Sequence, residues 1–290
     1  MSYKILLTTV SCFLFLTSNI SSQQKVLYEE VQALIDNSEF NDAKKTLEKN
    51  LKTYPDDAEL HFLYGYTLIQ MVGEISIFKK ISYAKKGRDQ YIKAIELDPK
   101  LIKAHKELSD YYLYSPGIVG GNTNKALQVI EGIKPHDPFK YLIYKGDFYS
   151  DKENYEEANK IFLSAIEQYP DSLAPLAKTG LSYRRLEEYQ KSADYFRKAI
   201  DMDSTYYLGY FHLGLAGLLG EFDLDKSISF FEIYIEQAVV GDQRYLDHAN
   251  YRIGMIYELK NNVELAKTYY QRSLAVNPEF ERAKEALEKL

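Results

Sequence analysis

The strongest constraint on the fold of this chain is a set of glycines with a fixed spacing. Gly146, Gly180 and Gly214 lie 34 residues apart, and Phe162 and Phe196 share that interval. Small and aromatic residues repeated with this period are typical of an array built from one supersecondary unit. Because one such unit cannot bury its apolar face alone, neighbouring units must stack into a continuous core. We therefore expect an extended surface rather than an active-site cleft.

The composition is compatible with such an array and limits its partners. Apolar residues make up 46% of the 290 residues, an ordinary fraction for a chain with a packed core. The length does not imply several globular domains, because a stacked array grows by adding repeats. The formal net charge is −6, and a chain with this charge is not expected to bind nucleic acid in general.

The first residues of the chain have the pattern of a secretory signal peptide. Lys4 precedes an apolar run over residues 5–16, and small polar residues follow. The run is shorter than the roughly 20 apolar residues of a transmembrane helix. We predict a signal peptide over residues 1–22, cleaved after Ser22, and export to the periplasm, the cell surface or the exterior of a bacterium. The alternative is an uncleaved signal, which is the only membrane attachment that we expect.

Cysteine chemistry is not expected in the mature chain. The single cysteine, Cys12, lies inside the apolar run. A lipoprotein role for it is disfavoured, because Thr9 precedes it where such signals carry leucine and the apolar run continues beyond it. The predicted mature protein therefore depends on packing without disulfides, and thiol catalysis and zinc–thiolate sites are excluded.

Further landmarks follow the 34-residue period. A glycine and a tyrosine three residues later are followed by an alanine, a large aromatic residue, a second alanine and a proline. The best copies are Gly146, Tyr149, Ala158, Phe162, Ala165 and Pro170, and Gly254, Tyr257, Ala266, Tyr270 and Pro278.

This pattern resembles the tetratricopeptide repeat, a helix–turn–helix unit of 34 residues. The resemblance implies an all-α fold, a right-handed α-solenoid of about seven stacked units over residues 23–290. Ala283, Leu287 and Leu290 would share one face of a short helix that caps the C-terminal end of the stack.

The period is broken in four places. About ten extra residues lie between Gly65 and Ala94, and about five between Tyr112 and Ala126, relative to the family period. The connection after Pro138 is short, and the connection around residues 239–244 is long. Insertions in solenoids form loops that often bind ligands, so residues 72–87 and 115–121 are candidate loops. The alternative is tolerated variation in length.

One of these candidate loops lies in a basic stretch. Residues 74–106 carry nine lysines and arginines against four acidic residues, although the whole chain is acidic. Such a patch could bind an acidic peptide or an anionic surface, and the alternative is a solvated helix face. The patch consists of Lys79, Lys80, Lys85, Lys86 and Arg88.

In the family that the chain resembles, the first helix of each unit lines a groove that holds a peptide or a helix of the partner. Some members bind a terminal carboxylate with paired Lys and Asn side chains. Lys106 stands at one such position, but Asp110 replaces the Asn and would repel a carboxylate. The predicted groove residues are Phe62, Tyr66, Lys106, Asp110, Tyr114, Asp147, Asp151, Arg184, Arg185, Phe211 and Tyr251.

Catalytic and cofactor motifs are weak throughout the sequence. The five histidines do not form a metal-ligand pair at helical spacing, and the glycines of residues 115–121 lack the Lys-Ser/Thr of a nucleotide loop. We therefore expect no enzyme activity and no cofactor or metal. The predicted function is an exported scaffold for protein–protein interaction. The alternative is a periplasmic small-ligand-binding solenoid associated with transport, in which the two insertions would enclose a pocket.

Overall fold

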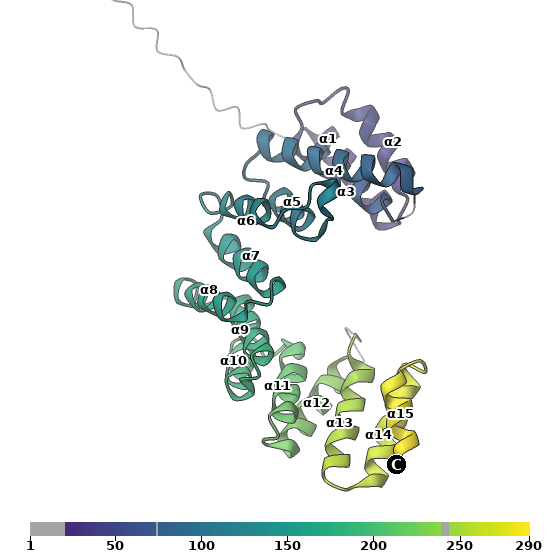
Figure 1. Ribbon diagram of the computed structural model, residues 1–290, viewed down its shortest axis with the longest axis vertical. Coiled ribbons are helices and arrows are strands. Elements are labelled where there is room, and N and C mark those ends of the chain that lie inside the picture. The colour runs from purple at the N-terminus through teal and green to yellow at the C-terminus, as the bar shows by residue number, and fades with distance from the viewer. Residues whose placement is uncertain (1–20, 74, 239–243) are drawn as a thin grey trace, which may run out of the picture. The chain divides into compact units, whose positions relative to one another are not determined.

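The computed structural model describes residues 21–73, 75–238 and 244–290, and all regular secondary structure in these residues is helical (Figure 1). The chain divides into two compact units. The first unit comprises residues 1–104 and 118–120, and the second comprises residues 105–117 and 121–290. The division falls inside one helix, Ile102–Tyr114.

The first unit contains two helix pairs, α1–α2 and α3–α4. The helices are α1 (Ser22–Asp36), α2 (Phe40–Asn50), α3 (Ala58–Met71) and α4 (Ile77–Leu97).

The second unit continues the alternation of helices and short turns. Helix α5 (Ile102–Tyr114) enters it at His105, and a 3-10 turn covers Gly117–Val119 at the boundary. The remaining helices are α6 (Thr123–Glu131), α7 (Pro138–Asp151), α8 (Tyr155–Gln168), α9 (Leu173–Arg185), α10 (Tyr189–Met202), α11 (Tyr207–Leu219), α12 (Leu224–Ala238), α13 (Leu246–Leu259), α14 (Val263–Val276) and α15 (Glu281–Lys289).

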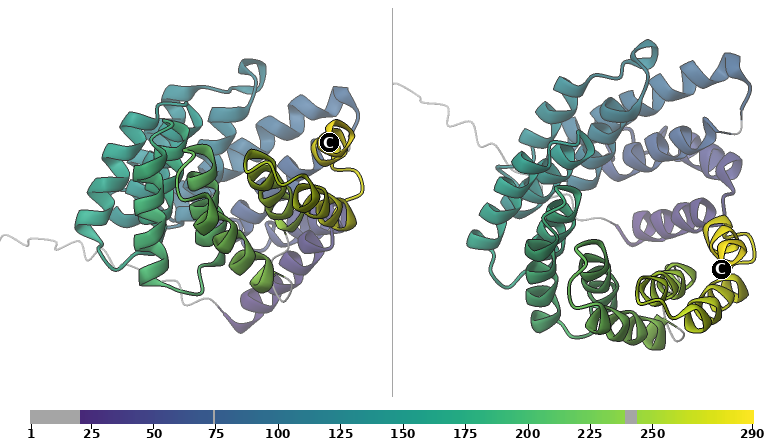
Figure 2. Two further views of the ribbon diagram at one scale, coloured as in Figure 1. Left: turned by 90° about the horizontal axis from the view of Figure 1, so that it is seen from below. Right: turned by 60° about the horizontal axis from the view of Figure 1, so that its bottom comes forward.

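Consecutive helices pack against one another throughout the second unit, as Figures 1 and 2 show. The described residues of the two units form seven helix pairs, and α15 packs on α14 after the last pair. This arrangement confirms the predicted all-α solenoid with a short C-terminal helix.

The repeated glycines allow the two helices of a pair to approach closely. A Cβ atom added to Gly146 would lie 2.1 Å from the Phe162 ring, and one added to Gly180 would lie 2.8 Å from the Phe196 ring. Gly254 faces Tyr270 in the same way. These aromatic rings are almost completely buried. The 34-residue period of the sequence is therefore the period of one steric contact.

In the third pair, α5–α6, a polar contact replaces the contact between glycine and an aromatic ring. Ser109 of α5 takes the place of the glycine, and its hydroxyl donates a hydrogen bond to the Ala126 carbonyl of α6 at 3.2 Å. Ile130 takes the place of the aromatic ring and is 2% exposed. A smaller side chain on α6 leaves room for the Cβ of serine.

The turn inside each pair repeats as regularly as the glycines. Glu153, Glu187 and Glu221 have φ values of 58°, 59° and 52°, and they too are 34 residues apart. In each turn the next residue's N–H reaches back five residues; that of Asn154, for example, donates to the Tyr149 carbonyl at 2.9 Å. This is the bonding pattern of a Schellman motif, which usually places glycine at the left-handed position. Glutamate occupies this position in all three turns, so no repeated glycine marks them in the sequence.

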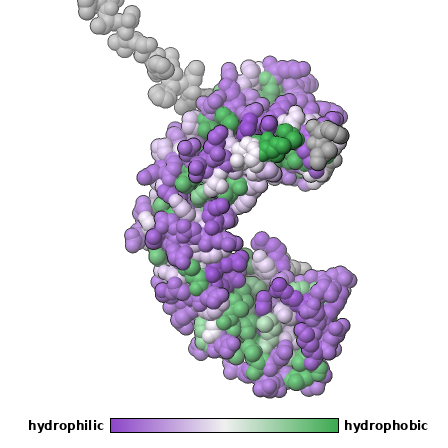
Figure 3. Space-filling model, in the orientation of Figure 1, coloured by the Kyte–Doolittle hydropathy of each residue, from purple (hydrophilic) through white to green (hydrophobic). Residues whose placement is uncertain are grey.

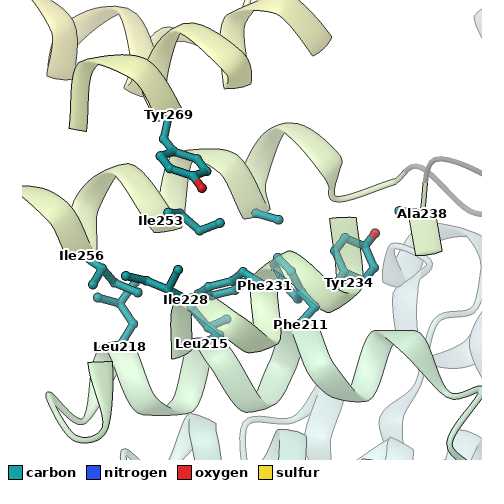
Figure 4. Close-up of a cluster of buried hydrophobic side chains, with 11 residues drawn as sticks. Phe211, Leu215, Leu218, Ile228, Phe231, Tyr234, Ala238, Ile253, Ile256 and Tyr269 are labelled. Atoms are coloured by element: carbon teal, nitrogen blue, oxygen red, sulfur yellow. The ribbon is translucent and has the colours of Figure 1, made fainter. Parts of the chain in front are cut away.

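The core of the second unit runs continuously between pairs. Figure 4 shows one segment, in which Phe231 of α12 lies between side chains of α11 and α13. Phe231, Ile253 and Ile256 are fully buried. Each pair thus covers the apolar face of the next, as the stacking argument requires.

The two candidate loops differ in the structure. Residues 77–87 of the first insertion are the N-terminal half of α4, so the prediction of a loop over residues 72–87 is wrong for most of its length. Residues 115–121 form a turn, in which the Gly121 N–H donates to the Pro116 carbonyl at 3.2 Å. The long connection falls mainly on residues 239–243, outside the described residues.

The predicted signal peptide lies almost entirely outside the described residues, and α1 begins at Ser22. Ser21 caps this helix, because its hydroxyl accepts a hydrogen bond from the Gln24 N–H. The Gln24 amide and the Tyr28 hydroxyl each donate to Asp57 at 2.7 Å, which joins α1 to the start of α3. The predicted cleavage after Ser22 would remove the cap and leave the contacts with Asp57.

We predict opposite effects for one substitution at two glycines. Gly146→Ala should lower the midpoint of urea unfolding, because displacing the Phe162 ring costs about 1–3 kcal/mol and outweighs the helix-propensity gain of about 1 kcal/mol. Gly117→Ala is the control, since nothing lies within 4 Å of its added Cβ, and it should be neutral or slightly stabilising. Equal effects of the two changes would contradict the steric role of Gly146.

Candidate binding surface

The second unit presents one surface formed by the first helices of successive pairs, α5, α7, α9, α11 and α13. We call it the first-helix face. Residues predicted for the groove occur on all five of these helices: Lys106, Asp110 and Tyr114 on α5, Asp147 and Asp151 on α7, Arg184 and Arg185 on α9, Phe211 on α11, and Tyr251 on α13.

Polar contacts link neighbouring first helices at the N-terminal end of this face. Lys106 pairs with Asp110 on α5, and its ammonium lies 5.7 Å from the centre of the Tyr144 ring of α7. The Tyr114 hydroxyl donates to the Asp151 carboxylate at 2.5 Å. Burial and the proximity of Asp151 raise the pKa of the Tyr114 hydroxyl, which therefore remains a donor. These contacts fix the positions of α5 and α7 side chains relative to one another.

Three of the predicted residues come together in a pocket between α7 and α9. Asp147, Asp151 and Arg185 line it, and its volume is about 200 Å³. The sequence did not identify the other lining residues, because their positions at the pocket depend on the stacking of two pairs. These residues are Ser150, Tyr155, Phe162, Lys178, Leu181 and Ser182.

Among the described residues, the pocket has one ion pair and one cation without an ion-pair partner. Lys178 donates to the Asp147 carboxylate at 2.6 Å, and both side chains are about 30% exposed. Burial raises the pKa of the Asp147 carboxyl, and the Lys178 ammonium counteracts the shift only in part. Arg185 is exposed and has no ion pair among the described residues. The pocket thus offers an available guanidinium beside carboxylates and apolar surface.

The C-terminal part of the face has a different electrostatic character. Arg184 of α9 and Arg252 of α13 are half-buried, and neither forms an ion pair with a described residue. Burial lowers the pKa of both guanidinium groups, and Arg252 and Arg185 lower that of Arg184 further. His212 of α11 stacks on Phe196 at 4.9 Å, and its burial lowers its pKa to about 3. His212 is therefore neutral at physiological pH.

Two predicted groove residues belong to the core instead. Phe211 is 5% exposed and its ring stacks on Tyr245 at 5.0 Å, so it cannot present a binding surface. Phe62, in the first unit, is 8% exposed and packs 5.9 Å from Tyr91. Phe211 fills space between α11, α12 and the start of α13, whereas Phe62 packs within the α3–α4 pair. Tyr66 is half-buried beside Phe62, also in the first unit.

The predicted basic patch does not form one surface. All five residues lie on α4, and successive residues of a helix are rotated by about 100°. Lys79 and Lys86 share a direction, whereas Lys80, Lys85 and Arg88 point elsewhere. Lys86 also lies 3.6 Å from the Glu48 carboxylate, and Arg88 pairs with Asp89 at 2.6 Å. The excess of positive charge along the sequence is therefore dispersed around a helix.

The described part of the chain was also searched for metal sites and membrane-spanning helices. There, no cluster of His, Cys, Asp or Glu is suited to a metal ion, and no helix is long and apolar enough to cross a membrane. His105 is buried, with Nδ1 3.2 Å from the Val129 carbonyl. In Figure 3, hydrophilic residues cover most of the face that is visible.

The Asp147–Lys178 pair predicts a pH-dependent effect of substitution. Lys178→Met should destabilise the fold by about 1–2 kcal/mol at neutral pH, because it leaves a half-buried carboxylate without its cation. The raised pKa of Asp147 should rise further in the variant. Folded protein then binds the proton more tightly than unfolded protein, so the stability deficit should be small near pH 4 and grow as the pH rises to about 7.

Urea unfolding at both pH values measures this effect. The matched control is Lys226→Met, which removes an exposed partner of Asp223 and should cost less than about 0.5 kcal/mol. A deficit of Lys178→Met that does not change with pH would contradict the role assigned to Asp147.

Comparisons with solved structures agree with this architecture. A C-terminal part of a TPR repeat-containing protein from Cytophaga hutchinsonii aligns with TM-score 0.58 and 16% identity, covering 90% of this chain and 99% of the other. A chain of the APC/C Cut9–Hcn1 hetero-tetramer has TM-score 0.58 and 15% identity, covering 91% and 48%. A tetratricopeptide repeat protein from Parabacteroides merdae has TM-score 0.53 and 16% identity, covering 91% and 97%.

At these identities the solved structures show a common fold. No match was found among curated proteins. Family models described as tetratricopeptide repeat match residues 28–70, 145–221 and 247–280, which together make up more than half of the chain. The chain belongs to the tetratricopeptide repeat family.

Proposed function

We propose that this protein is a scaffold that binds a segment of a partner protein along the first-helix face of its second unit. Tetratricopeptide repeat proteins bind protein or peptide partners, and the class of function follows from the family. The observation that supports this location is the pocket between α7 and α9. It combines an available guanidinium, carboxylates and apolar side chains on one surface.

The contacts around the pocket favour binding to a surface that is already ordered. Lys178, Tyr114 and Lys106 hold their acidic partners in place before any ligand arrives. A partner segment therefore orders few side chains of the scaffold and loses less entropy on binding. Binding of an enclosed small ligand is not favoured. It requires the larger insertion to form a loop over a pocket, but residues 77–87 of this insertion belong to α4, which packs against α3.

Peptide selection on the immobilised full chain tests this proposal. A random peptide library provides ligands, and calorimetry then gives their dissociation constants for wild type and variants. The double variant Asp151→Ala plus Arg185→Ala should weaken binding by about tenfold or more, as expected when central interface residues are lost.

The control variant removes the same two residue types from a second helix. Asp194 and Arg197 form an exposed ion pair on α10 at 2.8 Å, and replacing both with Ala should change affinity less than about twofold. If the two double variants behave alike, the partner does not bind at the pocket.

We further propose that the chain works outside the cytoplasm of a bacterium, in the periplasm or at the cell surface. The support is the charged, apolar and small polar order of residues 1–22. Expression of the full chain in a bacterium, followed by fractionation and mass determination, should give an exported protein shortened by about 20–22 residues. A full-length protein confined to the cytoplasm would contradict the proposal, and a full-length protein in the membrane would indicate an uncleaved signal.

A further inference from the structure

Arg184 and Arg252 differ from the other half-buried cations on the described first helices of the second unit. Lys106, Lys145 and Lys178 each pair with a carboxylate. Arg184 and Arg252 have no carboxylate partner in the described part of the chain. A cation removed from water without a partner destabilises a fold, so this exception calls for an explanation outside packing.

The hydrogen-bonding groups of Arg184 are also incompletely used. Its Nε is shielded from solvent and has no partner among the described residues. The residue lies in the last turn of α9, where the partial negative charge of the helix end favours a cation. That charge accounts for part of the stability of the guanidinium but supplies no acceptor for Nε. A buried donor without an acceptor is uncommon in a folded protein.

The partners of Arg252 among the described residues are weak. One of its terminal nitrogens lies 3.2 Å from the Met255 sulfur, and its guanidinium lies 5.4 Å from the centre of the Tyr251 ring. A thioether is a weak acceptor, and an aromatic face leaves the edge of the guanidinium free. The fork of donors that suits a carboxylate therefore remains available.

No carboxylate among the described residues offsets the charge of the two arginines. The charged groups that most affect the pKa of Arg184 are the cations Arg185 and Arg252, and Arg282 affects Arg252 in the same direction. His212, on the helix between them, is neutral, and its Nδ1 is buried without a hydrogen-bond partner. Unused donors and uncompensated charge thus occur together on α9, α11 and α13.

We propose that Arg184 and Arg252 bind the carboxylates of aspartate or glutamate side chains in the partner segment. This inference rests on the proposed function and adds the chemistry of the ligand. Guanidinium and carboxylate form paired hydrogen bonds, which would satisfy both groups at once. Because the two arginines lie on α9 and α13 with α11 between them, an extended acidic segment lying across the first helices reaches both.

Side-chain carboxylates fit the place better than phosphate. Arg184 lies at the C-terminal end of α9, where the helix presents carbonyl oxygens rather than N–H groups. Phosphate sites commonly use the opposite end of a helix, and a doubly charged group would be repelled by these carbonyls. The whole chain has a net charge of −6 and should repel an acidic peptide in general. Selective binding of such a peptide would therefore indicate a local cationic site.

The test uses the full chain and two blocked peptides. One peptide alternates Glu with Ala, and the other has Gln in place of every Glu; acetylation and amidation remove the terminal charges. Fluorescence anisotropy should show that wild type binds the Glu peptide about tenfold or more tightly than the Gln peptide, as expected for charge-assisted contacts. In the double variant Arg184→Met plus Arg252→Met, this preference should fall to about one.

Thermal unfolding without ligand supplies an independent readout. Removing two unpaired cations while keeping their apolar stems should raise the midpoint of the double variant by about 2 °C. Arg197→Met, which removes an exposed arginine paired with Asp194, should leave both the midpoint and the peptide preference unchanged. A purely structural role for Arg184 and Arg252 predicts the opposite, a lower midpoint.

The outcomes separate this inference from the proposed function. If selected peptides depend on Asp151 and Arg185 but wild type shows no preference for Glu over Gln, this inference alone is wrong. If the pocket variants leave every selected peptide bound as before, the proposed function fails and this inference fails with it. If inorganic phosphate raises the thermal midpoint as much as the Glu peptide does, the site binds phosphate and the carboxylate assignment is wrong.

Discussion

The contact between a glycine of one helix and an aromatic ring of the next determines how each repeat is built. At Gly146 and Gly180 there is no room for a Cβ atom, because the rings of Phe162 and Phe196 occupy that space. The close approach buries the rings completely and aligns the two helices of a pair. Stacking then continues through residues such as Phe231, which belongs to the core between two pairs. The chain can vary elsewhere while this contact is kept.

Because the buried glycine–aromatic contacts hold each pair together, the side chains of the first-helix face can serve recognition. In the second unit, its N-terminal part uses its charges internally, as the pairs Lys106–Asp110 and Lys178–Asp147 show. Its C-terminal part has the half-buried Arg184 and Arg252, for which the described residues provide no carboxylate. The two unpaired guanidinium groups lower the stability of the fold, and the carboxylates of a partner can supply the missing ion pairs. Such a loss of stability is common at functional sites.

The sequence predicted the parts of this structure that follow from periodicity. The recurring glycine, aromatic, alanine and proline landmarks predicted the helix pairs and their number, because they mark a contact that recurs. The spacing of Ala283, Leu287 and Leu290 predicted the terminal helix. The same reasoning failed at residues 72–87, since an insertion can lengthen a helix as easily as a loop. It also failed at Phe211, where a groove position and a core position have the same sequence spacing and only the packing of Tyr245 distinguishes them.

The binding surface was predictable only in part. The repeat position placed Asp147, Asp151 and Arg185 on first helices, and the structure joins them in one pocket. Lys178 was not identified, because its importance comes from a partner on the preceding pair. Arg184 was not singled out among the predicted residues, because its Nε lacks an acceptor among the described residues and a missing contact leaves no pattern in the sequence. The excess of positive charge over residues 74–106 wrongly predicted one basic patch, because the cations of α4 point in different directions.

The central claim is that a partner lies on the first helices of the second unit. Photo-cross-linking with a selected peptide tests it most directly, with p-benzoylphenylalanine replacing Tyr144 of α7, Tyr251 of α13 or Tyr195 of α10. All three tyrosines are half-buried, so the replacements are comparable. Cross-links to the peptide are expected from positions 144 and 251 and none from position 195. Cross-links from position 195 alone would place the partner on the second helices and exclude binding at the first-helix face.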